Sequence, residues 1–102
     1  MSNSGRRLIV RHLPDVRRFA IQITEADEAF LEYEMRPANV MDMVHTVTPA
    51  AHRGQRIAHT LAAHAFDYAI ANNYRVMPTC TFIQHYVNTI ASDAHRAQVL
   101  KE

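Results

Sequence analysis

The sequence predicts an α/β domain in which a mainly antiparallel sheet is crossed by one long helix. Three observations indicate this fold class. Short segments that alternate apolar and polar residues, separated by turns, fill the first half of the chain, as in an antiparallel meander. A stripe of alanines at helical spacing follows them. A short apolar segment comes directly after this stripe, where a right-handed crossover would place a strand parallel to the previous one.

The first half of the chain divides into four expected strands. Turn-forming residues such as Pro14–Asp15 separate them, and Pro49 ends the last one because proline cannot donate to a ladder. Alternation directs Leu31, Tyr33 and Met35 inward. The last strand is mostly apolar, which is typical of a central position. The expected strands are Leu8–His12, Val16–Ile23, Phe30–Arg36 and Val40–Val47.

The second half begins with a helix that is expected to run from about Gly54 to Asn72. Its alanine stripe lets it lie close on the sheet, and Asn72–Asn73 can supply a left-handed exit. Tyr74–Met77 is then expected to form the fifth strand, parallel to the fourth. Ser92 or Asp93 could cap a last short helix. The stripe consists of Ala58, Ala62, Ala65 and Ala69, and the two further helices are expected over 81–91 and 94–100.

The two parallel strands are expected to part near their C-terminal ends. Pro78 has no N–H group, so the fifth strand cannot continue its ladder beyond this residue. In open sheets with crossover helices, ligands bind at the C-terminal ends of parallel strands. The sequence therefore predicts a cleft in which an extended ligand arm pairs with the strand edges. The cleft would be bounded by His45, Thr46 and Val47 on one side and by Pro78, Thr79 and Cys80 on the other.

A glycine-bearing basic loop opens the long helix at the mouth of this cleft. The first N–H groups of a helix have no internal partners, and the helix dipole makes this end attractive to anions. Arg53 and Arg56 add two guanidinium groups beside Gly54. A phosphate-bearing ligand is the expected guest. The alternative is that these residues form no more than a solvated basic turn.

These residues together resemble a known family. A strand that ends in His-Thr-x-x-Pro, then Arg-Gly-x-x-Ile-Ala at a helix start, then a strand that ends in Pro-Thr-Cys, is similar to the small single-domain members of the GCN5-related N-acetyltransferase (GNAT) superfamily. The stretches DMVHTVTPAAHRGQRIAHTLAAHAFDYA and PTCTFIQHYV carry the resemblance, which covers about residues 16–87. The glycine loop alone would be a weak signal, but the set is specific.

The resemblance implies that the protein binds acetyl-coenzyme A and passes the acetyl group to an amine or thiol. The superfamily loop [QR]-x-x-G-x-[GA] binds the pyrophosphate of the coenzyme through backbone N–H groups. Arg53 matches its first position and Ala58 its last. The coenzyme-binding residues implied here are Arg53, Gly54, Gln55, Arg56, Ile57 and Ala58, together with the cleft residues Thr46, Val47, Pro78 and Thr79.

Arg56 departs from the superfamily pattern, which has glycine at this position. A side chain there hinders the close approach of the backbone to phosphate. Because it lies at a helix start, Arg56 is expected to have an unstrained backbone, and its guanidinium could swing round to clamp a phosphate. The resemblance therefore implies weakened or altered coenzyme affinity rather than its loss.

Three residues are implied in the chemistry. Cys80 takes the position of a cysteine that lies close to the thioester in the short relatives, as an acetyl acceptor or as a group beside the sulfur. His45 would be the base if it points into the cleft, and Tyr86 would protonate the leaving thiolate. Each also has an alternative without chemistry. Cys80 could be a small buried residue, His45 a hydrogen-bonded structural group and Tyr86 a core residue.

Composition limits the remaining possibilities. The 102 residues suffice for one domain, 1–102, with a polar tail expected at 1–7. The net charge of +1 argues against nucleic-acid binding, and no apolar run has the length of a membrane span. The single cysteine fits a reducing compartment, and a cytoplasmic protein is expected. Histidines such as His59 and His64 show no ligand spacing, so no metal site is expected. The main rival to an enzyme is a non-catalytic coenzyme A-binding or protein-interaction module.

Overall fold

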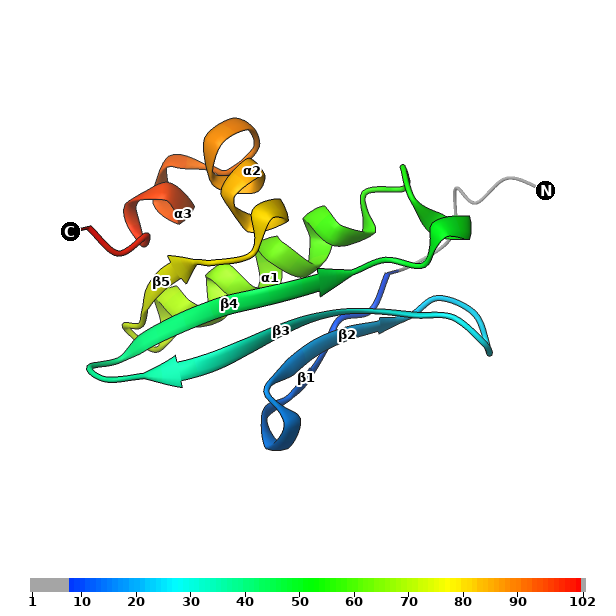
Figure 1. Ribbon diagram of the computed structural model, residues 1–102, viewed down its shortest axis with the longest axis horizontal. Coiled ribbons are helices and arrows are strands. Elements are labelled where there is room, and N and C mark those ends of the chain that lie inside the picture. Colours follow the sequence, from blue (N-terminus) through cyan, green and yellow to red (C-terminus); the bar gives the residue numbers. More distant parts are fainter. Residues whose placement is uncertain (1–7, 102) are drawn as a thin grey trace.

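The computed structural model describes residues 8–101, so the polar tail expected at 1–7 lies outside the described residues. Five strands form one sheet in the order β1-β2-β3-β4-β5, and α1 crosses it (Figure 1). The strands are β1 Arg11–Leu13, β2 Arg18–Gln22, β3 Glu28–Arg36, β4 Val40–Val47 and β5 Arg75–Pro78. The helices are α1 Ile57–Ala71, α2 Thr81–Thr89 and α3 Asp93–Ala97, with the 3₁₀ helices η1 Pro14–Val16 and η2 Ala50–His52.

The strand directions confirm the predicted fold class. Neighbouring strands from β1 to β4 are antiparallel, while β4 and β5 are parallel because α1 carries the chain back along the sheet. Asn73, with φ 59°, provides the left-handed exit from α1. The last helix is shorter than predicted because the chain returns to the sheet edge, where Val99 forms a parallel bridge with Val76.

The core lies between α1 and the sheet. Ala62, Ala65 and Ala69 are completely buried, and so are Leu61 and Phe66 on either side of them. Small side chains allow the helix axis to approach the sheet, and the flanking large ones fill the space beside it. α2 and α3 pack against α1 in turn. Within residues 8–101 no helix is long and apolar enough to cross a membrane.

The opposite face of the sheet carries ion pairs instead of a helix in the part of the chain that the structure describes (Figure 1). Arg18 donates to Glu32 over 2.6 Å, and its guanidinium lies 4.0 Å from the centre of the Phe30 ring. Arg17 pairs with Glu34 over 3.2 Å. The sheet therefore has one apolar face, which α1 covers, and one polar face, which no helix of the described chain covers.

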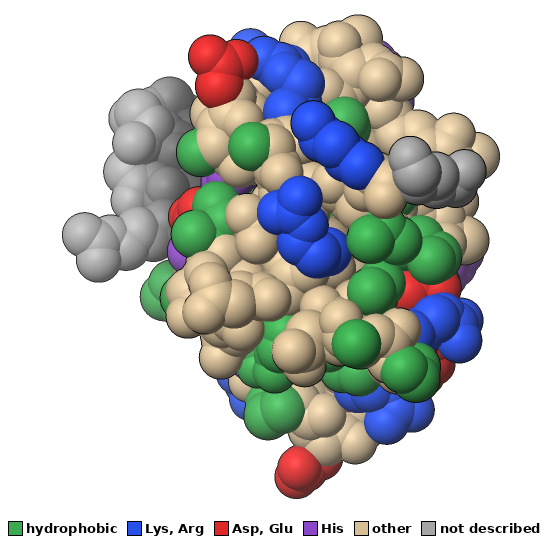
Figure 2. All heavy atoms as spheres, turned by 90° about the vertical axis from the view of Figure 1, so that its left-hand side faces the viewer, with side chains coloured by type: hydrophobic (Ala, Val, Ile, Leu, Met, Phe, Trp, Pro, Cys, Tyr) green, Lys and Arg blue, Asp and Glu red, His purple; other side chains and the backbone are tan. Residues whose placement is uncertain are grey.

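One inward prediction is wrong. Met35 was expected in the core but is 40% exposed. It lies beside the turn between β3 and β4, where this hairpin reaches the end of the molecule and nothing covers it in the described chain (Figure 1). Figure 2 faces this end and shows apolar side chains exposed among Lys and Arg side chains. The pocket described below lies at the other end of β4.

An imidazole is packed into an aromatic cluster at the β1 edge. His12 stacks on Phe19 with ring centres 4.2 Å apart and meets the edge of Tyr68 at 4.4 Å. Its Nε2 is 2.7 Å from the hydroxyl of Tyr33. Burial lowers the pKa of His12 below its ordinary value, because a charged imidazolium is poorly solvated there. The neutral form is therefore the one that this cluster holds.

This packing predicts a fall in stability on mild acidification. Because the pKa is lower in the folded protein, the unfolded chain binds the proton more readily as the pH falls. The contribution of His12 is fully present above about pH 6.5 and is lost as the pH falls through the lower pKa of the folded state. We expect the free energy of unfolding in urea to differ less between pH 5 and pH 7.5 in His12→Gln than in wild type. The control is His64→Gln, on the exposed face of α1, which should behave as wild type. An equal pH difference in His12→Gln and wild type would contradict this role of His12.

Candidate functional site

The two parallel strands part at the residue where the sequence predicted it. Their pairing runs from Val40 opposite Arg75 to Met43 opposite Pro78. The N–H of Cys80 still donates to the carbonyl of Met43 over 2.9 Å. Beyond this bond β4 continues to Val47, whereas the segment after β5 turns into α2. The edge of β4 after Met43 is thus left without a strand partner on the β5 side in the described chain.

A β-bulge in β4 marks the same point. Glu32 faces His45, whereas the next residue of β3, Tyr33, faces Met43, so Val44 is an extra residue in β4. A bulge bends its strand and increases the local twist, and this one comes directly after Met43, the last residue of β4 that pairs with β5. The sequence did not predict it, because a stretch of apolar and polar residues without glycine or proline gives no sign of an extra residue.

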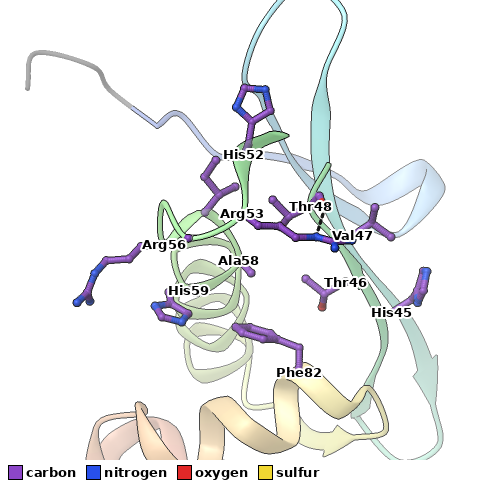
Figure 3. A pocket seen from close by; sticks show the side chains of 12 residues that line it. His45, Thr46, Val47, Thr48, His52, Arg53, Arg56, Ala58, His59 and Phe82 are labelled. Atoms are coloured by element: carbon purple, nitrogen blue, oxygen red, sulfur yellow. Dashed lines mark hydrogen bonds between the residues drawn. The ribbon is translucent and has the colours of Figure 1, made fainter. Parts of the chain in front are cut away.

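A pocket of about 660 Å³ opens at this end of the sheet (Figure 3). It lies between the end of β4, the loop before α1, the first turn of α1 and the start of α2. Eight predicted site residues line it: His45, Thr46, Val47, Arg53, Gly54, Arg56, Ile57 and Ala58. The lining also includes four residues that sequence reasoning missed, Thr48, His52, His59 and Phe82, and it does not include Gln55, Pro78, Thr79, Cys80 or Tyr86.

The start of α1 offers free backbone donors to this pocket. No side chain caps the helix, and the first amide of this region that finds an acceptor is that of Thr60, which donates to the carbonyl of Arg56 over 3.1 Å. In the described chain the N–H groups of residues 54–59 have no hydrogen-bond acceptor. Such a cluster of unpaired donors at the positive end of a helix dipole favours an anion.

The backbone of this loop corrects two predictions. Gly54 has φ 84° and Arg56 has φ 62°, both in the left-handed region. α1 therefore begins at Ile57 and not at Gly54, because a right-handed helix cannot include these conformations. The expected unstrained backbone of Arg56 is also wrong, since the left-handed conformation costs roughly 1–2 kcal/mol in a residue with a side chain. The position suits glycine for this reason as well as for close approach to a ligand.

The side chains around the free amides are basic. Arg53 and Arg56 line the pocket, and no aspartate or glutamate is among the described residues that do so. The Nε of Arg53 donates to the carbonyl of Thr48 over 3.3 Å. Figure 3 shows the side chain of Arg56 extending away from the cavity. The pocket is therefore electropositive, with one guanidinium held across it and the other at its outer edge.

His59 and Phe82 close the side of the pocket between α1 and α2. Their rings are nearly parallel, at 16°, with centres 5.7 Å apart. The pKa of His59 is lowered by burial first and then by the charges of Arg56 and His85. Neither residue gave a signal in the sequence, because their proximity depends on how α2 packs beside the first turn of α1.

The side chains of Cys80 and Thr46 meet across the gap where β4 and the segment after β5 part. The thiol of Cys80 donates to the hydroxyl of Thr46, with sulfur and oxygen 3.5 Å apart, and the cysteine is buried. His45 precedes Thr46 but is exposed, with its ring 6.4 Å from that of Phe30 on the open face of the sheet. Figure 3 shows its side chain pointing away from the cavity. Cys80 thus lies against Thr46 where the two segments part, outside the pocket lining, and the His45 side chain lies on the open face of the sheet.

The other predicted residues lie farther from the pocket lining. The hydroxyl of Tyr86 is 2.9 Å from Nδ1 of His95, whose Nε2 is 2.8 Å from a carboxylate oxygen of Asp67. Burial, and secondarily the charge of Asp67, raise the pKa of Tyr86. The hydroxyl of Thr79 donates to the buried carboxylate of Asp42, which also accepts from Arg36 over 2.7 Å. Within residues 8–101 no group of three or more His, Cys, Asp or Glu residues could hold a metal ion.

Comparison with known proteins decides the family. Residues 18–95 match the model of the family described as GCN5-related N-acetyl-transferase. The chain belongs to this family. It is similar to Protein NATD1 of Danio rerio, with 37% identity over 79% of this chain and 74% of the relative. Protein NATD1 of Homo sapiens is 35% identical over 76% of this chain and 70% of its own length. Protein NATD1 of Mus musculus is 34% identical over 81% of this chain and 76% of its own length.

Family membership confirms the resemblance read from the sequence, including its boundaries to within a few residues at the start. GCN5-related N-acetyltransferases generally use acetyl-coenzyme A, a ligand with a diphosphate, an extended pantetheine arm and a thioester. Three features of this structure lie at the same end of β4. They are the free amides before and within the first turn of α1, the unpaired edge of β4, and the gap that contains Cys80.

Proposed function

We propose that this GNAT protein binds acetyl-coenzyme A and transfers the acetyl group to an amine or thiol. The observation that carries the proposal is the uncapped start of α1, whose free amides open on a pocket lined by arginines and by no acidic residue of the described chain. The diphosphate would accept from the N–H groups of residues 54–58. A charge-assisted hydrogen bond contributes about 1.5–3 kcal/mol before ordering costs.

The pantetheine arm would then follow the unpaired edge of β4 toward the gap. Thr46 and Val47 supply this edge, the opposing strand ends at Pro78, and Thr79 follows it. An extended arm with amide groups can pair with free strand edges as another strand would. This course brings the thioester toward Cys80 and Thr46. A backbone N–H near Val47 is the proposed donor to the thioester carbonyl as negative charge develops on its oxygen.

Transfer to an amine needs a base on the side of the acceptor. We propose His45 as this base, although its side chain does not point into the cleft as this role was expected to require (Figure 3). It lies instead on the open face of the sheet, next in sequence to Thr46. The amine nitrogen attacks the carbonyl carbon, its proton passes to His45, the C–S bond breaks, and the coenzyme leaves as a thiolate that solvent protonates. Cys80 is proposed beside the thioester, where its own thiol is the alternative acceptor. Tyr86 receives no role, since its hydroxyl is already engaged with His95.

A titration with acetyl-coenzyme A and coenzyme A tests the proposal. We expect saturable binding in isothermal calorimetry and, with added amines, release of free coenzyme thiol. Mass spectrometry after incubation should show whether an acetyl group remains on the protein, and Cys80→Ala should remove any such adduct. Absence of binding at millimolar coenzyme would overturn the proposal. The proposed setting is the cytoplasm, whose reducing conditions suit a single unpaired thiol.

One observation favours a second candidate function, a non-catalytic coenzyme-binding or protein-interaction module. In the described chain no helix covers the sheet face that carries His45 (Figure 1), so an acceptor bound there would have no helix beside it. A module would bind coenzyme A without turnover for any amine tested, and Cys80→Ala would change nothing. Release of coenzyme thiol that depends on an added amine would exclude it.

A further inference from the structure

A hydrogen bond between two side chains connects the loop before α1, residues 48–56, to the β2–β3 hairpin. Nε2 of His52, the last residue of η2, is 2.8 Å from a carboxylate oxygen of Asp27, in the turn between β2 and β3. Only 12% of the His52 side chain is exposed, against 37% for Asp27. Figure 3 shows the His52 ring pointing away from the cavity, so the contact supports the loop from behind.

The hairpin side of this contact is held firmly. The hydroxyl of Thr24 accepts from the N–H groups of Ala26 and Asp27 over 3.3 and 3.0 Å. The carbonyl of Asp27 accepts from the N–H groups of Ile23 and Thr24 over 2.9 and 3.2 Å. The backbone of Asp27 is thus held in a compact turn at the end of two paired strands, and its carboxylate projects from this turn toward His52.

The loop side has few other restraints. The hydrogen bonds of residues 48–56 include His52 N–H to the carbonyl of Pro49 over 2.9 Å, and Arg53 N–H to that of Ala50 over 3.4 Å. Arg53 also reaches back to Thr48. These bonds stay within the loop, and Thr60 joins only its last residue to α1. In the described chain, the contact with Asp27 is the side-chain hydrogen bond that connects this loop to another part of the sheet.

We propose that Asp27 and His52 form a latch that positions the amides of residues 54–58 for the donor diphosphate. The inference rests on the proposed function. Both are positioning residues, because Asp27 does not line the pocket and the ring of His52, which does line it, points away from the cavity toward Asp27 (Figure 3). His52 directly precedes Arg53 and Gly54, so fixing its ring fixes the point from which the free amides project. Donor groups held in place before binding lose less conformational entropy when the ligand arrives.

The coupling between the two residues is measurable through coenzyme A affinity. We expect Asp27→Ala and His52→Ala each to weaken binding about tenfold, and the double variant to bind no worse than either, because each change breaks the same contact. Asp27→Asn should retain most of the affinity, since its side-chain oxygen still accepts from the imidazole N–H. Asp93→Ala, which removes an exposed ion pair with Arg96 away from the pocket, is the matched control.

A second measurement separates the latch from the proposed function. Backbone ¹⁵N relaxation of the free protein should show lower order parameters over residues 53–57 in Asp27→Ala than in wild type and Asp93→Ala. If wild type binds no coenzyme A, the proposed function fails while this measurement still tests the latch. Unchanged order parameters, additive losses of affinity, or a loss of affinity that merely follows a lower Tm across all variants would overturn the latch.

Discussion

Replacing Ala58 by glutamate should abolish coenzyme A binding and leave the protein at least as stable as wild type. Ala58 is the second residue of α1 and lines the pocket, so the new carboxylate would stand where the diphosphate is proposed to lie. Two negative charges about 4 Å apart near a protein surface repel by roughly 4 kcal/mol, which corresponds to a loss of more than about 100-fold in affinity. The same carboxylate at a helix start interacts favourably with the dipole by about 0.3–1 kcal/mol.

The opposite signs of the two effects make this variant informative. A loss of binding with an unchanged or higher Tm cannot come from unfolding. Ala58→Gln has the same size without the charge, so calorimetry on both variants separates the filling of the pocket from electrostatic repulsion. Wild-type affinity in Ala58→Glu would show that the diphosphate does not bind at the start of α1, whatever else the pocket binds.

The parts of this site that could be predicted are those set by local chemistry. Pro78 ends a strand because it lacks a donor, and the stripe of alanines brings α1 close to the sheet. The basic loop around Gly54 predicted unpaired amides beside guanidinium groups, and the two lie together before α1. Each inference needs only neighbouring residues, and the observed strands, helix and pocket agree with it at the level of elements.

The parts that could not be predicted depend on contacts between distant segments. The bulge at Val44 is a difference in register between β3 and β4, and neither strand shows it alone. The left-handed backbone of Arg56 follows from the way the loop enters α1, although the superfamily preference for glycine at this position was a usable signal. His52 and Asp27 are 25 residues apart, so only the folded chain identifies them as partners.

The placement of His45 provides the sharpest test between an enzyme and a binding module. Its side chain points away from the pocket, onto the open face of the sheet, but it adjoins Thr46, whose hydroxyl contacts Cys80 (Figure 3). We expect His45→Gln to lower kcat for acetyl transfer by about 100-fold or more, the usual contribution of a general base. The Kd for coenzyme A should not change, because the side chain of His45 does not face the proposed coenzyme site.

The control and the contrary outcome concern two other residues. His64→Gln changes an exposed imidazole on α1 and should leave kcat and Kd as in wild type. If His45→Gln keeps full activity while Cys80→Ala abolishes both transfer and the acetyl adduct, the thiol is the acceptor and an amine attacks in a second step. That result would keep the proposed donor site and replace the proposed base, because the thiol of Cys80 contacts Thr46 whereas the side chain of His45 points away from the pocket (Figure 3).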